Sequence, residues 1–226
     1  MTERCIVFDV DDTLYIERDY IRSGFAAVDT WLLTEHALPG FAQRAWGYFE
    51  RTFKGDFEES LTRAIESMGL QATPELLETI MHIYCTHEPD IELLPDARQC
   101  LNSLHGDFPL AALTEGDIPS QHAKVEVLDI NNWCTPVVYA SRWGPEEQTR
   151  ALKEVERRTG FAGQCLFVSH DPHALDIPRQ LGWEVARIRR SESRMFHVKT
   201  HADVPEFPDL ADFALWLVGA RASPSA

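Results

Sequence analysis

The stretch "RCIVFDVDDTLY" (Arg4–Tyr15) joins an apolar run to a cluster of charges. Residues 5–8 are apolar and partly β-branched, which is typical of a strand buried on both faces. Three carboxylates then follow within four positions: Asp9, Asp11 and Asp12. Neighbouring carboxylates repel one another, and each loses hydration free energy when it leaves water. Crowding of this kind at a strand end indicates a site with a chemical role.

Further strand-like runs recur along the chain, and segments with helical periodicity lie between them. This alternation predicts right-handed βαβ units on a parallel sheet, with reactive residues at the carboxyl ends of the strands. We therefore expect an α/β protein with a Rossmann-like parallel sheet core and helices on both faces. The predicted strands are residues 5–10, 108–116, 135–141, 164–170 and 183–190, and the predicted helices between them are 95–105, 119–129, 145–159 and 172–181.

Residues 16–90 break the alternation, because helix signals replace the expected second strand. Asp56 opens a capping box at the start of one helix, and Thr73 with Pro74 marks the start of another. With two earlier helices, around 19–35 and 39–53, this segment predicts a four-helix insertion. The expected domains are a core of residues 1–15 and 91–226 and a helical domain of residues 16–90.

Composition limits the classes of partner. The chain has 226 residues, of which 44% are hydrophobic and 25% charged, and its formal net charge is −15. These fractions are ordinary for a soluble globular protein. The negative charge argues against a nucleic-acid or membrane partner, since both require clustered Lys and Arg. An anionic substrate must be bound by local groups or by a cation, because the overall field repels it.

The cysteines and the N-terminus indicate a cytoplasmic location. Five widely spaced cysteines without a CxxC pair suggest neither a zinc site nor a disulfide framework. The start "MTERCIVF" has no signal-peptide pattern, and no apolar run approaches the roughly 20 residues of a membrane span.

The segment "DVDDT" (Asp9–Thr13) can support phosphoryl chemistry. Asp9 and Asp11 stand two positions apart, and a turn after the strand can direct both to one point. Two close carboxylates ionise together only if a cation lies between them. Mg²⁺ suits this role because it takes oxygen ligands and retains waters. One carboxylate could then attack phosphorus while the other gives a proton to the leaving oxygen.

The same residues resemble a known family. "FDVDDTLY" (Phe8–Tyr15) is similar to the first motif, DxDxT followed by Leu, of the haloacid dehalogenase-like (HAD) superfamily, most of whose members are phosphatases. The resemblance implies that Asp9 is the nucleophile, that Asp11 is the general acid or base, and that Thr13 shapes the turn. It also implies that the inserted helices form a C1-type cap. We expect Asp12 to face solvent or to cap the turn.

The second family motif is a Ser or Thr at the end of the next core strand, where it binds phosphoryl oxygens. "LAALTEGD" supplies Thr114, followed by Glu115. Taken alone, Thr114 would more often be a helix N-cap. Its place after a strand, downstream of a complete first motif, favours substrate binding by Thr114 and Glu115.

The third family motif is a Lys or Arg that holds the nucleophile and the phosphate, and here the sequence departs from the family. Arg142 is the nearest cation after the third core strand. Lys124 lies in the helix after "TEGD" and is the second candidate, because the "Q..K" pattern of that helix also looks family-like. We rank Arg142 above Lys124.

The fourth family motif also departs. The resemblance implies Gly-Asp after a strand and a second Asp about five residues on, with an acidic residue binding Mg²⁺, whereas this chain reads "FVSHDPHALD". In one alignment His170 takes the ligand position. In the other, shifted by one residue, Asp171 is the ligand and Asp176 supports it. We favour Asp171, because Mg²⁺ prefers hard oxygen ligands.

The sequence therefore favours a Mg²⁺-dependent phosphatase that acts on a small phosphorylated metabolite, with Asp9, Asp11 and Asp171 as metal ligands. Two alternatives remain. A 2-haloacid dehalogenase needs the nucleophile but no acid, and the presence of Asp11 counts against it. A degenerate HAD domain that binds a ligand or a protein without turnover would account for the altered third and fourth motifs.

Overall fold

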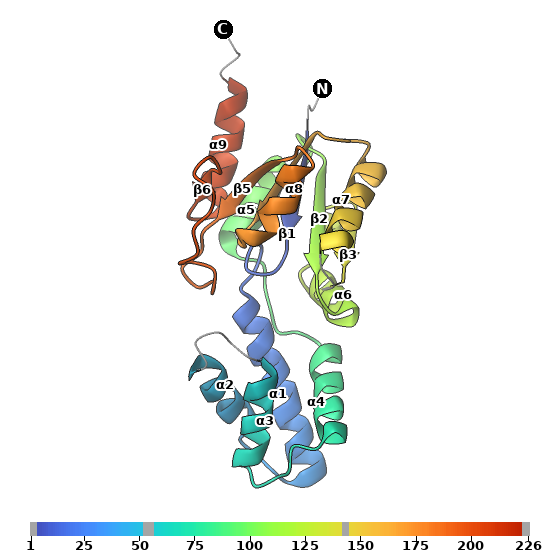
Figure 1. The fold of residues 1–226 in the computed structure, drawn as a ribbon, viewed down its shortest axis with the longest axis vertical. Coiled ribbons are helices and arrows are strands. Elements are labelled where there is room, and N and C mark those ends of the chain that lie inside the picture. Colours follow the sequence, from blue (N-terminus) through green and yellow to red (C-terminus); the bar gives the residue numbers. More distant parts are fainter. Residues whose placement is uncertain (1–3, 52–56, 142–144, 223–226) are drawn as a thin grey trace. The chain divides into compact units, whose positions relative to one another are not determined.

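The computed structural model describes residues 4–51, 57–141 and 145–222. The chain divides into two compact units: a core unit of Met1–Glu17 and Glu92–Ala226, and a helical unit of Arg18–Ile91 (Figure 1). These boundaries lie within two residues of those expected from the sequence. That the helical unit acts as a cap stays a prediction.

A parallel sheet forms the centre of the core unit (Figure 1). Within the described residues it has six strands in the order β3-β2-β1-β4-β5-β6, all paired in parallel. The central strand β1 lies between β2 and β4, so the chain changes direction across the sheet at the carboxyl end of β1. Ligands bind at such a switch point in open α/β sheets. The strands are β1 (Cys5–Asp9), β2 (Leu110–Glu115), β3 (Val137–Ala140), β4 (Cys165–Ser169), β5 (Glu184–Ile188) and β6 (Glu206–Phe207).

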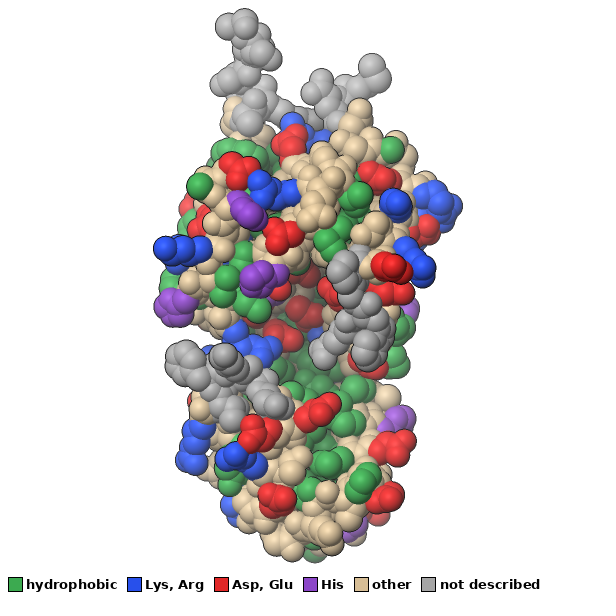
Figure 2. Space-filling view, viewed as in Figure 1, with side chains coloured by type: hydrophobic (Ala, Val, Ile, Leu, Met, Phe, Trp, Pro, Cys, Tyr) green, Lys and Arg blue, Asp and Glu red, His purple; other side chains and the backbone are tan. Residues whose placement is uncertain are grey.

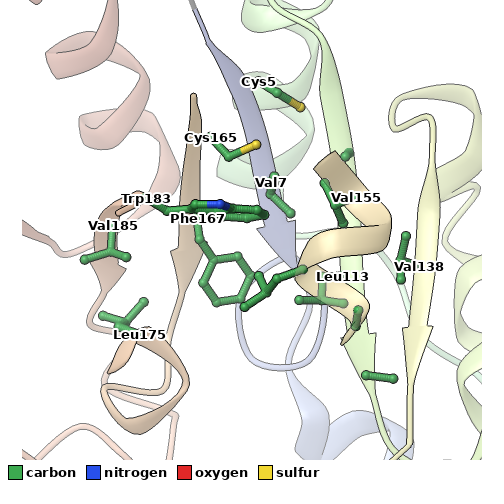
Figure 3. Close-up of a cluster of buried hydrophobic side chains, with 14 of the residues drawn as sticks. Cys5, Val7, Leu113, Val138, Val155, Cys165, Phe167, Leu175, Trp183 and Val185 are labelled. Atoms are coloured by element: carbon green, nitrogen blue, oxygen red, sulfur yellow. The ribbon is translucent and has the colours of Figure 1, made fainter. Parts of the chain in front are cut away.

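The apolar residues of β1 alternate between two covered faces. Cys5 and Val7 pack with residues of β4 and α7, while Phe8 meets Phe213 of α9 edge to face at 6.3 Å. Figure 3 shows Val7 in one cluster with Leu113, Phe167 and Val155 of α7. Burial on both faces explains the unbroken apolar run. The helices of the core unit are α5 (Pro95–Leu104), α6 (Ile118–Val127), η1 (Ile130–Asn132), α7 (Pro145–Thr159), η2 (His173–Leu175), α8 (Asp176–Gln180) and α9 (Leu210–Ala222).

The helical unit contains the inserted helices. Thr73 caps the last of them as predicted, since its Oγ1 accepts the Leu76 N–H at 3.3 Å. Asp56, predicted as the cap of another, lies outside the described residues. Aromatic side chains fill the centre of the unit, including Phe25 at 1% exposure, which meets Phe41 edge to face. The helices are α1 (Glu17–His36), α2 (Phe41–Arg51), α3 (Phe57–Ser67) and α4 (Pro74–Thr86).

The predicted α/β class with a parallel sheet is confirmed, and three of the described elements were not predicted: the short helix η1, the strand β6 and the helix α9. The strand β6 extends the edge of the sheet beyond β5, and α9 packs beside α5. No helix in the described part of the chain is long and apolar enough to cross a membrane.

Candidate active site

Three neighbouring strands of the sheet end at the candidate site, and they carry three of the predicted residues: Asp9, Thr114 and Glu115. Asp9 ends β1, Glu115 ends β2 and Ser169 ends β4. Because the strands are parallel and in register, with Asp9 beside Leu113 and Phe8 beside Val168, these ends meet at one edge of the sheet. This edge is the switch point at which a ligand is expected.

The carboxylate of Asp9 is fixed by the turn that follows it and by β4. Its Oδ2 accepts the Ser169 hydroxyl at 2.7 Å, the Thr13 hydroxyl at 3.1 Å and Nδ1 of His170 at 3.2 Å. Among the described residues, the one group that donates to its Oδ1 is the Val10 N–H, at 2.8 Å. The side chain remains 16% exposed. Oδ1 is therefore the oxygen with lone-pair capacity for a reaction.

The turn after Asp9 is shaped by Asp12 and Thr13. Asp12 has a φ of 49° and is 3% exposed, so it does not face solvent. Its Oδ1 instead accepts the Glu17 N–H at 2.8 Å, which caps the start of α1. Thr13 donates to Asp9 and accepts the His170 N–H at 3.0 Å, and so joins the first and fourth motifs.

Asp11 lies in a second cluster of buried groups. Its Oδ1 accepts Nζ of Lys124 at 2.7 Å and the Tyr15 hydroxyl, and its Oδ2 accepts Nε2 of Gln121 at 3.0 Å. Burial alone would raise the pKa of Asp11. The Lys124 charge and the three hydrogen-bond donors outweigh burial, so this pKa lies below its ordinary value. Asp11 is thus an ionised carboxylate, whereas the sequence argument required it to carry a proton.

Thr114 and Glu115 differ in their surroundings. Thr114 is 1% exposed, and its hydroxyl donates to Oε1 of Gln121 at 2.5 Å. Glu115 is exposed at the end of β2, and its carbonyl accepts Nε2 of Gln121 at 3.3 Å. Gln121 thereby connects the second motif to Asp11. Gly116 leaves room for it, since a Cβ there would lie 2.8 Å from Nε2 of Gln121.

The two candidates for the third motif have different outcomes. Arg142, which we ranked first, lies outside the described residues. Lys124 is 3% exposed and pairs with Asp11 rather than with Asp9. The structure thus places Lys124 at the site as the cation of the second cluster.

The fourth motif brings His170 to Asp9. The Nδ1 atom of His170 lies 3.2 Å from Oδ2 of Asp9, and Nε2 lies 3.9 Å from Oδ2 of Asp12. Burial alone would lower the pKa of His170. The hydrogen bond and charge of Asp9, with the charges of Asp12 and Asp171, outweigh burial and raise this pKa to about 9.

The two acidic residues predicted for the fourth motif have other partners. Oδ1 of Asp171 accepts the His173 N–H at 2.9 Å, inside the turn that leads into η2. Asp176 begins α8, and its Oδ1 lies 3.1 Å from Nε2 of His201. Neither side chain shares a hydrogen bond with Asp9.

Two buried arginines that the sequence did not single out hold the loops of the site. Arg187 is 1% exposed and donates from Nε to the His170 carbonyl at 3.2 Å. Arg190 donates from one nitrogen to the Thr13 carbonyl at 2.9 Å and to Asp96 at 2.7 Å. No local pattern marks these residues, because their partners are far away in the sequence. The sequence pointed to Tyr15 and Gln121 only weakly. The one sign was that they lie close in sequence to the predicted site residues Asp11 and Lys124.

The residues of the site do not fit the Mg²⁺ ion that the resemblance implies. Oδ2 of Asp9 already accepts three hydrogen bonds, and the group beside it is the ring of His170. In the described parts of the chain, no three His, Cys, Asp or Glu side chains converge on a point that could hold a metal. Mg²⁺ requires oxygen ligands in near-octahedral geometry. We therefore derive no reaction step through a metal ion.

Comparison with known proteins establishes the fold of the chain but does not assign the chain to a sequence family. No protein-family model matches the chain, and no curated protein matches it. Among solved structures, L-2-haloacid dehalogenase from Xanthobacter autotrophicus is 21% identical with a TM-score of 0.60, covering 97% of this chain and 99% of that one. A 2-haloacid dehalogenase from Pseudomonas syringae pv. Tomato DC3000 is 19% identical, with a TM-score of 0.61 and coverage of 99% and 100%.

A third structure, named HAD-hydrolase YfnB from Bacillus subtilis and solved bound to magnesium, is 17% identical with a TM-score of 0.61. It covers 96% of this chain and 99% of its own. At such identities the likeness establishes the fold alone. The chain has the haloacid dehalogenase-like hydrolase fold, and the predicted resemblance is confirmed at that level.

Proposed function

We propose that this chain is a hydrolase in which Asp9 attacks the phosphorus of a small phosphorylated metabolite. The observation that carries the proposal is the state of the Asp9 carboxylate at the end of the central strand. Within the described part of the chain, its Oδ2 is fixed by three donors and its Oδ1 accepts a single hydrogen bond. A fixed carboxylate with one reactive oxygen is suited to nucleophilic catalysis.

The proposed reaction has two steps. Oδ1 of Asp9 forms a bond to phosphorus while the bond from phosphorus to the leaving oxygen breaks, and the leaving oxygen takes a proton from solvent. Water then attacks phosphorus while the bond from phosphorus to Oδ1 of Asp9 breaks, which releases inorganic phosphate and restores the Asp9 carboxylate. The proton of that water passes to Asp11, which is ionised and therefore able to act as a base. Lys124 and His170 supply positive charge near the phosphoryl group. In contrast to the sequence-based prediction, no step is assigned to Mg²⁺.

A second candidate, hydrolysis of a 2-haloacid, is favoured by one observation. Halide leaves without a proton, so the paired and ionised state of Asp11 does not hinder it. The presence of Asp11, which in the sequence counts against a dehalogenase, therefore carries less weight in the structure. Two of the compared structures are named as 2-haloacid dehalogenases.

A substrate panel separates the two candidates. The purified chain is assayed for phosphate release from p-nitrophenyl phosphate and from phosphorylated metabolites, and for halide release from 2-chloropropionate. The reactive variant is Asp9→Asn, and the matched control is Asp203→Asn, at a side chain that is 71% exposed. Phosphate release that is lost in Asp9→Asn and kept in Asp203→Asn supports the phosphatase.

Two other results of this panel contradict the phosphatase. Halide release with the same dependence on Asp9 would assign the chain as a dehalogenase. No turnover of any compound by folded protein would indicate the degenerate HAD domain, which binds without catalysis.

A further inference from the structure

We infer that the side chain of His170 takes the place of a divalent cation beside Asp9, so that the site works without a metal ion. The inference deepens the proposed function and rests on it for the role of Asp9. It runs against the expectation from the resemblance, which puts Mg²⁺ at this point.

The position of the ring supports the inference. His170 lies between two carboxylates, with Nδ1 at 3.2 Å from Asp9 and Nε2 at 3.9 Å from Asp12. Its side chain is 16% exposed, and the side chain of Asp12 is 4% exposed. A half-buried carboxylate and a buried one on either side of a single ring favour positive charge between them, and the imidazole ring is the group that lies there.

The backbone of His170 is anchored on both sides, so the ring does not reach Asp9 by chance rotation of a loose loop. Its N–H donates to Oγ1 of Thr13 at 3.0 Å. Its carbonyl accepts Nε of Arg187 at 3.2 Å, and Arg187 is 1% exposed. The anchoring residue Thr13 also donates to Asp9, so the ring and the carboxylate are positioned by the same hydroxyl.

At least one carboxylate oxygen of each expected metal ligand already accepts hydrogen bonds from protein groups. Oδ2 of Asp9 accepts Ser169 and Thr13 in addition to His170. Oδ1 of Asp171, the ligand expected from the sequence, accepts the His173 N–H. A divalent ion would have to displace the ring and these donors, and it would be repelled by any cationic ring that stayed nearby.

Direct metal binding tests the inference independently of turnover. Calorimetry with Mg²⁺ and electron paramagnetic resonance with Mn²⁺ are applied to the wild-type chain, to His170→Asp and to His170→Gln. We expect no saturable binding by wild-type protein. His170→Asp replaces the ring by oxygen ligands and should gain one site, whereas His170→Gln should gain none. The added site must disappear in the double variant His170→Asp with Asp9→Asn.

Activity provides the second readout. Phosphate release by wild-type protein should be the same with Mg²⁺ and with EDTA, and His170→Gln should lose turnover on the order of 10²-fold, as when one stabilising donor is removed from an active site. Stoichiometric Mg²⁺ binding by wild-type protein that is lost in Asp9→Asn would overturn the inference while leaving the proposed function intact. Absence of turnover with no metal binding would instead overturn the proposed function alone.

Discussion

At the scale of single residues, the site separates two carboxylates that the sequence places two positions apart. Asp9 contacts Ser169 and His170 from β4 and the turn after it, whereas Asp11 contacts Gln121 and Lys124 from α6. The two groups therefore have different environments, as the proposed division into nucleophile and base requires. Separation of this kind is how one site assigns nucleophile and base to identical side chains.

The ionised state of Asp11 predicts how the rate depends on the leaving group. A carboxylate that is paired with Lys124 cannot protonate a leaving alkoxide, so substrates with more acidic leaving groups should react faster. The measurement is kcat/KM for a series of aryl phosphates whose phenols differ in pKa. We expect a clear negative slope against the pKa of the phenol, and the same slope in Asp11→Asn. A flat plot for the wild-type chain would mean that Asp11 does give a proton.

The Lys124–Asp11 pair predicts a pH-dependent stability. Lys124→Met leaves the Asp11 carboxylate, whose side chain is 17% exposed, without its cation and should cost about 3 to 5 kcal/mol of unfolding free energy near neutral pH. In the wild-type chain the folded-state pKa of Asp11 is lowered, so its contribution is present above the ordinary carboxyl pKa and lost as the pH falls through the lowered value. Without Lys124, burial raises this pKa, and Asp11 takes a proton earlier as the pH falls.

The difference in stability between wild type and Lys124→Met should therefore shrink on acidification, which urea unfolding at several pH values will measure. Lys153→Met, at an exposed position of α7, is the matched control and should change stability by about 0.5 kcal/mol at most. A difference that is independent of pH would show that Asp11 is not the group that Lys124 stabilises.

At the scale of elements, sequence periodicity was a good guide to the first five strands and to the α-helices that lie between them in the chain. The five core strands and the intervening α-helices were predicted from apolar runs and caps. The strand β6 was missed because two residues carry no period. The helix α9 was missed because "LADFALWLVGARA" is apolar on more than one face, although Asp209 caps it by accepting the Asp212 N–H.

A pair of glycines provides a test of helix packing in the helical unit. Alanine stabilises an open helix position by about 1 kcal/mol relative to glycine, and this should hold for Gly47 of α2, where an added Cβ meets nothing within 4 Å. Gly24→Ala in α1 should instead destabilise by about 1 to 3 kcal/mol, since its Cβ would lie 2.4 Å from the ring of Tyr84. That ring is itself packed against Tyr20 and Phe57.

Thermal or urea unfolding of the two variants checks this pair. Opposite signs for Gly24→Ala and Gly47→Ala are the expected result. Equal stabilisation by both would show that Tyr84 can move aside, and that the contact between α1 and α4 is looser than described.

At the scale of the whole molecule, the sequence predicted at which strand ends the site lies. It did not predict which side chains contact one another there. The first motif located Asp9, and the βα pattern placed Thr114 near it. The contact between His170 and Asp9 depends on the pairing of β1 with β4, which no local pattern encodes. The roles of Arg187 and Arg190 likewise depend on which loops the sheet order brings together.

The surface charge of the core unit is mixed on the face that Figure 2 shows. Among the described residues there, blue Lys and Arg side chains are interspersed with red Asp and Glu side chains. This face therefore offers no extended basic area for a polyanion, in keeping with the net charge of −15. The absence of a nucleic-acid partner stays a prediction.

The chain connections predict that the helical unit can be removed. The Leu94 N–H donates to the Leu14 carbonyl at 3.0 Å. The segment that leaves the core unit and the segment that re-enters it therefore lie side by side. Replacement of residues 18–91 by a short Gly/Ser linker should leave a core that unfolds cooperatively, because it keeps its own sheet and hydrophobic cluster. Circular dichroism and urea unfolding test this. A truncated chain that is unfolded or aggregated would show that the core depends on the helical unit.

The short outer strands have a consequence for the behaviour of the protein in concentrated solution. One border of the sheet ends in β6, which has two residues, and the other in β3, which has four. In addition, the Val137 carbonyl of β3 accepts a hydrogen bond from the Arg158 guanidinium at 3.2 Å. An open ladder of unpaired backbone groups is what lets one molecule add its strand to another. Because the described edge strands are this short, we expect the sheet to resist edge-to-edge pairing with another molecule.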